Sequence, residues 1–133
     1  METFDIVDNY FCKVCEIPED ELDPASRALV EVWHSGGLIG NGGLHDYLCA
    51  IGDKAYSIAD HYRIAGLHDA ASLIDLATDL WKQYWPKESP EDSDPDKFRD
   101  MFGPQLDKIE ADYFKLKEEF PDKLVKIIPK SSN

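Results

Sequence analysis

The stretch Leu67–Tyr84, LHDAASLIDLATDLWKQY, repeats its apolar residues at intervals of three and four. An α-helix turns once in about 3.6 residues, so this spacing places the apolar residues on one face. The polar residues between them then fall on the opposite face. The sequence therefore predicts an amphipathic helix from about Leu67 to Tyr84, whose core-facing stripe consists of Ala70, Leu73, Ile74, Ala77, Leu80 and Trp81.

Residues before this helix show the same period, interrupted by turn residues. A first helix is expected over residues 3–17. Asp23 is expected to cap a second helix that Pro24 begins, since aspartate favours the N-cap and proline the first helical position. Glycine is a poor residue for a helix interior, and the pair Gly36-Gly37 is expected to end this second helix.

Four glycines within eight residues indicate a turn between the second helix and a third. Asn41 is expected to cap the third helix, which contains Tyr47. A fourth helix is expected from Ala55 to just before Gly66, because glycine is common directly after a helix end. Asn41, Gly42 and Gly43 are thus interpreted as a cap and tight turn.

The last third of the chain begins with a break in the pattern. Residues 86–97 hold three prolines and are expected to form a surface loop. A short helical piece at 98–102 follows, then a long helix opened by Gly103-Pro104, and a final short helix that Pro121 starts.

No convincing alternation of apolar and polar residues indicates a strand. We therefore expect an all-α fold, a compact single domain of six or seven short helices. The 133 residues are enough for one domain with its own core. The domain is expected to span residues 1–129, with a frayed tail at 130–133.

Charge restricts the function more than the helices do. Fourteen basic residues face 27 acidic ones, for a net charge of −13. Such a surface repels phosphate groups, which argues against direct binding of nucleic acid and against attachment to an anionic membrane. The N-terminal residues lack the features of a targeting signal, and the three cysteines do not form a disulfide framework, so we expect a cytoplasmic protein with reduced thiols.

The negative charge gathers in two clusters. Acidic clusters usually serve only solubility, but these can also match a basic partner protein. We expect them to form a partner-binding acidic surface made of Glu16, Glu19, Asp20, Glu21, Asp23, Glu88, Glu91, Asp92, Asp94 and Asp96.

Catalytic and metal-binding patterns are weak. The run Asp92-x-Asp94-x-Asp96 resembles a calcium loop, but Lys97 stands where that loop needs glycine. Cys12-x-x-Cys15 has no paired histidines to complete a zinc site, so buried or half-buried free thiols are expected. Neighbours on a helix point in different directions, so His45-Asp46 is not expected to form a catalytic dyad. We expect no cofactor, no metal and no enzymatic activity.

The segment Asn41-Gly42-Gly43-Leu44-His45-Asp46-Tyr47-Leu48 resembles the signature of a family of small bacterial all-α domains, whose best-known members are called DNA mimic proteins. In that signature, Asn-Gly-Gly is followed by aromatic residues, and here Leu44 and Leu48 replace two of them. The resemblance spans about Ala25 to Ile128. It implies a compact helical protein that often dimerises and whose acidic surface covers the DNA-binding face of a partner such as a transcription factor.

Four functions follow as hypotheses. The leading one is a non-enzymatic DNA mimic that binds a basic, nucleic-acid-binding protein, with a steep dependence on salt. The alternative is an immunity or antidote protein against a basic toxin or nuclease. The third is a small hydrolase or metal-dependent enzyme that uses the histidines His34, His45, His61 and His68. The fourth is a structural homodimer with one of three tryptophans at its interface, namely Trp33, Trp81 or Trp85.

Overall fold

A computed structural model describes residues 2–84 and 95–129, and all structural statements refer to this part of the chain. It contains six α-helices, three short 3-10 turns and no strand, which confirms the predicted all-α fold. The helices are α1 (Thr3–Val14), α2 (Pro24–Ile51), α3 (Ala55–Ile64), α4 (His68–Tyr84), α5 (Pro95–Lys117) and α6 (Phe120–Leu124), and the turns are η1 (Glu19–Glu21), η2 (Gly52–Lys54) and η4 (Val125–Ile127).

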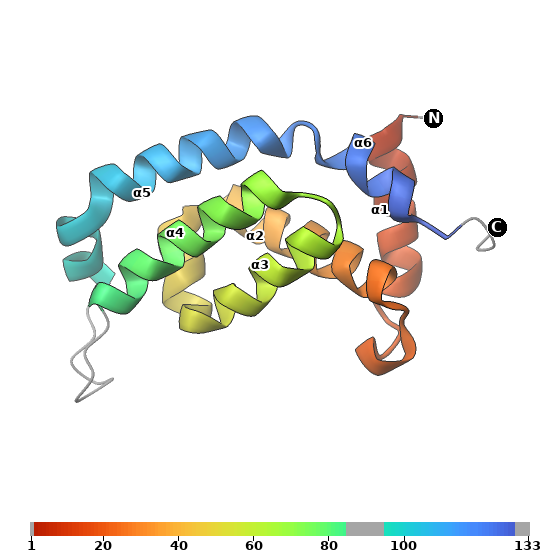
Figure 1. Ribbon diagram of the computed structural model, residues 1–133, viewed down its shortest axis with the longest axis horizontal. Coiled ribbons are helices and arrows are strands. Elements are labelled where there is room, and N and C mark those ends of the chain that lie inside the picture. Colours follow the sequence, from red (N-terminus) through yellow and green to blue (C-terminus); the bar gives the residue numbers. More distant parts are fainter. Residues whose placement is uncertain (1, 85–94, 130–133) are drawn as a thin grey trace.

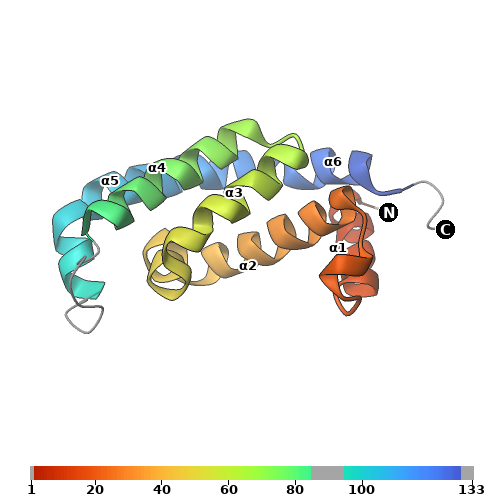
Figure 2. The same cartoon turned by 60° about the horizontal axis from the view of Figure 1, so that its bottom comes forward.

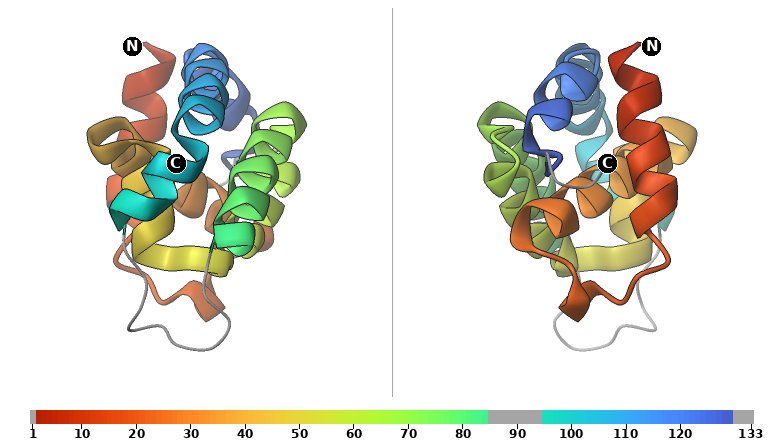
Figure 3. Two further views of the ribbon diagram at one scale, coloured as in Figure 1. Left: turned by 90° about the vertical axis from the view of Figure 1, so that its left-hand side faces the viewer. Right: turned by 90° about the vertical axis from the view of Figure 1, so that its right-hand side faces the viewer.

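The helices form an elongated bundle (Figure 1). Helix α4 packs against α3 on one side and α5 on the other, and α2 packs against α3 and α5. Turning the molecule shows α2 and α3 below the α4–α5 layer (Figure 2). Helices α1 and α6 pack together at one end, beside both chain termini, as the end views show (Figure 3).

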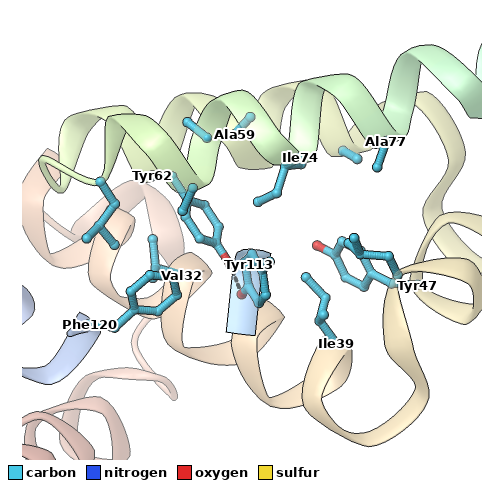
Figure 4. Packing of buried hydrophobic residues seen from close by; sticks show 14 of the residues in the cluster. Val32, Ile39, Tyr47, Ala59, Tyr62, Ile74, Ala77, Tyr113 and Phe120 are labelled. Carbon is cyan, nitrogen blue, oxygen red and sulfur yellow. Dashed lines mark hydrogen bonds between the residues drawn. The ribbon is translucent and has the colours of Figure 1, made fainter. Parts of the chain in front are cut away.

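A chain of buried hydroxyl groups crosses the centre of the core. The Tyr62 hydroxyl lies 2.8 Å from that of Tyr113 and 2.7 Å from Ser35 Oγ. These three residues come from α3, α5 and α2. Their neighbours are apolar, and the ring of Phe120 packs edge-on against both tyrosines (Figure 4). Each buried hydroxyl is thereby hydrogen-bonded, which removes the free-energy cost of burying it unpaired.

Helix α2 differs from the prediction, because it does not end at Gly36-Gly37. It continues through both glycines and through Gly40, and its backbone breaks only at Gly43. There φ is 81° and ψ is 172°, a conformation that is essentially restricted to glycine. Gly36 is buried, and a Cβ atom there would lie 3.6 Å from the Tyr113 hydroxyl, which is an ordinary contact distance.

Helix α5 also differs from the prediction. It starts at Pro95, so residues 95–97 are helical and do not belong to a loop. The pair Gly103-Pro104 lies inside the helix and does not begin it. Phe98 explains why the chain is helical this early, since its fully buried ring packs edge-on against Trp81 of α4 at 5.3 Å between centroids. The rest of the predicted loop, residues 86–94, and the predicted tail, residues 130–133, lie outside the described residues.

Candidate protein-binding surface

The first acidic cluster lies on the connection between α1 and α2. We call residues 16–23 the acidic turn; it contains Pro18 and the 3-10 turn η1. It projects at the α1 end of the molecule (orange in Figure 3). All five of its predicted partner-binding residues are exposed: Glu16, Glu19, Asp20, Glu21 and Asp23.

Two of these five carboxylates hold the turn in place. Asp23 caps α2 as predicted, because its carboxylate accepts hydrogen bonds from the Ser26 backbone N–H at 3.1 Å and the Ser26 hydroxyl at 2.7 Å. These bonds lower the pKa of Asp23. Glu19 forms an ion pair with Arg27 of α2 at 3.2 Å. Glu19 therefore has a structural role that the sequence analysis did not predict, whereas the capping role of Asp23 was predicted.

The remaining three carboxylates of the turn point to solvent. The side chains of Glu16, Asp20 and Glu21 have no hydrogen-bond or ion-pair partner within residues 2–84 and 95–129. Unpaired carboxylates on a fixed turn give a local negative potential that is not neutralised by the protein's own cations. Within the acidic turn, these three residues are the ones whose carboxylates are available to a partner.

Glu31 of α2 adds a carboxyl group that the sequence analysis missed. It is half-buried, and burial together with its hydrogen bond to Glu19 raises its pKa to about 7. The same hydrogen bond lowers the pKa of Glu19. His61 of α3 is close to Glu19 and Arg27; its Nδ1 is buried without a hydrogen-bond partner, and burial lowers its pKa. Only the tertiary approach of α3 to α2 creates this group, so no local sequence signal marks it.

The second acidic cluster is described only in part. Asp96 is exposed in the first turn of α5, whereas Glu88, Glu91, Asp92 and Asp94 lie outside the described residues. The start of α5 and the acidic turn lie at opposite ends of the long axis (Figures 1 and 2). Asp96 and the acidic turn therefore do not form one continuous patch.

The Asn-Gly-Gly segment has a structural role at the break in α2. Asn41 is exposed and lies within the helix, so the prediction that it caps a new helix is wrong. The cap comes from α5, where Glu110 Oε1 accepts a hydrogen bond from the Leu44 backbone N–H at 2.7 Å. A Cβ atom at Gly43 would lie 2.4 Å from that oxygen. Close approach of Glu110 thus requires glycine at this position.

Two further members of the segment, Tyr47 and Gly42, differ in their surroundings. Tyr47 is buried, and burial raises the pKa of its hydroxyl. A Cβ atom at Gly42 would lie 3.0 Å from the Asp46 carboxylate. Tyr47 therefore packs in the core, whereas Gly42 is exposed and lies beside an exposed carboxylate.

The structure brings together one set of side chains that the sequence analysis had separated. His45 Nδ1 lies 3.1 Å from Asp46 Oδ1, so the two adjacent side chains do meet. His45 Nε2 lies 3.9 Å from the Cys49 sulfur, one helical turn further on. Burial and the Asp46 charge raise the pKa of the Cys49 thiol, which favours the unreactive protonated form.

The structure also shows the surroundings of the cysteines and of the other candidate metal ligands. Cys12 and Cys15 are free thiols, as predicted, but both are exposed, because they lie on the solvent side of α1; the predicted burial is wrong. No group of three or more potential metal-ligating side chains occurs within the described residues. None of the described helices is long and apolar enough to cross a membrane.

The fold and the acidic turn define a small, all-α, strongly acidic protein. Comparison with family models gives the particular family: residues 20–130 match the model of the DMP19-like proteins. Because this match covers most of the chain, the protein belongs to the DMP19-like family, which confirms the predicted family. The assignment of the Asn-Gly-Gly segment as its signature stays a prediction. Searches of curated proteins and of solved structures returned no match.

Proposed function

We propose that this protein is a non-enzymatic DNA mimic, which occupies the basic nucleic-acid-binding surface of a partner protein such as a transcription factor. The observation that carries the proposal is the acidic turn, which exposes the carboxylates of Glu16, Asp20 and Glu21 with no partner among the described residues. Membership of the DMP19-like family supports it. The raised pKa of Cys49 in the His45–Asp46–Cys49 group argues against thiol catalysis.

The partner contact is expected to be electrostatic. A surface that binds DNA carries many cations, because duplex DNA has about one charge per ~1.7 Å of its axis. Carboxylates that replace these phosphates attract the same cations over a distance set by the salt concentration. Complex formation should therefore weaken steeply as salt increases, and added duplex DNA should compete for the partner.

The experiment is affinity capture from a native extract on the immobilised protein, with elution by a salt gradient and by duplex DNA. We expect a basic DNA-binding protein that DNA displaces. Its affinity is then compared for wild type and for a triple variant with Glu16, Asp20 and Glu21 changed to lysine. A further variant reverses Glu88, Glu91, Asp92 and Asp94 in the same way.

A matched control separates location from total charge. Asp53, Asp69 and Glu118 are exposed and lie outside both clusters. Changing these three to lysine alters the net charge by the same amount as the triple variant in the acidic turn. Equal loss of affinity in both triple variants, or no loss in either, contradicts binding through the acidic turn. Capture of a toxin or nuclease instead would favour the immunity function.

Homodimer formation is a separate part of the proposal. Phe4, Leu38 and Phe114 are exposed large apolar side chains on α1, α2 and α5, and an interface between two copies would cover such residues. Sedimentation velocity over a range of protein concentrations measures the oligomeric state directly. A monomer at all concentrations would contradict it.

A further inference from the structure

An apolar cavity of about 270 Å³ opens between α1, α2, α5 and α6, away from the acidic turn. Its walls include the rings of Phe4, Trp33 and Phe120. The first two rings pack against each other with 5.0 Å between centroids. Gly37 forms part of the wall, and a Cβ atom there would meet no other atom within 4 Å. The cavity thus has flat aromatic walls and free space beside α2.

Among the residues that line this cavity, one is cationic, Lys117 of α5. Its Nζ donates a hydrogen bond to the Gly36 carbonyl oxygen at 2.9 Å. None of the ion pairs within residues 2–84 and 95–129 includes Lys117. An ammonium group has three N–H donors, so two remain for another acceptor. Burial lowers the pKa of Lys117, as expected for a cation held away from water without a counter-charge.

Glycines on α2 allow the lysine to lie there. A Cβ atom at Gly40 would come within 2.8 Å of Lys117 Nζ, and one at Gly36 within 3.6 Å of Lys117 Cε. Any larger side chain at position 40 would push the amine away from the Gly36 carbonyl. The ammonium group can therefore lie beside the Gly36 carbonyl because α2 has no side chain at position 40.

We propose that this cavity binds a small monocarboxylic acid with an aromatic body. The carboxylate pairs with Lys117 Nζ, and the ring packs among Phe4, Trp33 and Phe120. Charge-assisted hydrogen bonds are stronger than neutral ones, and aromatic rings gain energy from tilted packing against one another. The volume is just below the range of about 300–1,000 Å³ that is usual for ligand pockets, so the ligand is small.

The surroundings select a single negative charge. The wider groove next to the cavity shares Phe4 and Lys117 with it and also carries Glu2, Glu118 and Asp122. These acidic residues and the net charge of −13 repel a second negative charge on a ligand. Dicarboxylates and phosphorylated compounds are therefore disfavoured.

The test uses phenylacetate as the probe and neutral phenylacetamide as its matched comparator. Both are titrated into the ¹⁵N-labelled full chain, and amide shifts are followed by NMR. We expect saturable binding of phenylacetate with shifts at Trp33, Gly36 and Gly37. Phenylacetamide should bind about tenfold more weakly or worse, since it lacks the charge that strengthens the hydrogen bond.

Two variants test the assignment independently. Lys117→Met keeps most of the apolar stem and removes the charge, and Lys115→Met on the exposed face of the same helix is its control. Gly37→Leu fills the cavity from a helical position with open space. Both Lys117→Met and Gly37→Leu should weaken phenylacetate binding about tenfold or more, whereas Lys115→Met should leave it unchanged. Circular dichroism checks that each variant folds.

Several results would overturn the proposal. These are no saturable binding of phenylacetate, equal affinity for the amide, shifts confined to other parts of the protein, or wild-type affinity in a folded Lys117→Met or Gly37→Leu variant. Amide shifts at the cavity that change on dilution without any probe would mean that a second copy of the chain covers it. Failure to bind a basic partner would not affect the test of phenylacetate binding, because no residue of the acidic turn lines the cavity.

Discussion

The Leu44 backbone N–H and the Glu110 carboxylate are 66 residues apart in the sequence and 2.7 Å apart in the structure. Leu44 follows the break in α2, where a new helical segment begins with unpaired N–H groups. A carboxylate at such a point provides both a hydrogen-bond acceptor and a charge that the helix dipole favours. Helix α5 therefore stabilises a bend in α2 that the local sequence does not cap.

Gly43 permits this arrangement, so Gly43→Ala should destabilise the fold. Alanine is strained at φ 81° and ψ 172°, and its Cβ atom would lie 2.4 Å from Glu110 Oε1. The strained backbone conformation alone should lower the free energy of unfolding by about 1–3 kcal/mol. Urea unfolding measures the change. Gly37→Ala in the same helix is the control and should be neutral or stabilising by up to about 1 kcal/mol, because its Cβ atom meets nothing. Equal stability of the two variants would contradict this account.

Glu110→Ala should destabilise the protein by about 1–3 kcal/mol, since the Leu44 N–H loses a charged acceptor in a part-buried position. Glu110→Gln should recover part of the loss through its amide oxygen. The free energy of unfolding is measured for both. Glu118→Ala, an exposed carboxylate just after α5, is the control and should change stability by less than about 0.5 kcal/mol. A large loss of stability in Glu118→Ala would mean that the change in net charge, and not the loss of the cap, explains the effect of Glu110→Ala.

Asp23→Ala should reduce stability by about 1 kcal/mol through loss of the α2 cap. Its neighbour Asp20→Ala removes the same charge without a cap and should be close to neutral. The lowered pKa of Asp23 means that its stabilising effect is present above the unfolded value of 3.8 and is lost as the pH falls below it. Chemical unfolding of both variants at pH 7 and at pH 3 checks the difference, which should shrink at the lower pH.

Glu31→Gln should be more stable than wild type at pH 8. The folded-state pKa of Glu31 is about 7 against 4.5 for the unfolded chain, so the folded protein holds the proton more tightly. Stability then falls as pH rises from about 4.5 through 7, and the amide removes this loss. Thermal unfolding is measured at pH 4.5, 6 and 8, and the difference in stability between the two proteins should increase with pH. The lowered pKa of His61 affects both proteins and cancels in the comparison. A constant gap would contradict the assignment.

Short-range signals in the sequence predicted several helix ends correctly. Asp23 caps α2 next to Pro24, and Gly66 follows α3 at φ 82°. The stripe of α4 is largely buried, from Ala70 to Trp81. These features depend on residues within one or two helical turns, so a local pattern contains the information for them.

The predictions based on glycine and proline were wrong at positions where contacts between distant helices determine the structure. Gly36 was expected to end a helix and Gly40 to lie in the turn after it, yet both lie inside α2 with Tyr113 and Lys117 of α5 close to them. Pro104 was expected to begin a helix and lies within α5. The approach of α5 is a long-range event, and the same event creates the Glu110 cap. Among the site residues, the exposed acids of the turn could be predicted, but the buried neighbours Glu31 and His61 could not.

The acidic turn is fixed by bonds to nearby residues of α2, from Glu19 to Arg27 and Glu31 and from Asp23 to Ser26. The three carboxylates of Glu16, Asp20 and Glu21 are exposed. Mutations at Glu16, Asp20 and Glu21 can therefore accumulate during evolution without a folding penalty, while Gly43 and Glu110 can change only together with the bend in α2. Related chains are expected to retain the bend and to diverge in the pattern of charge on the turn.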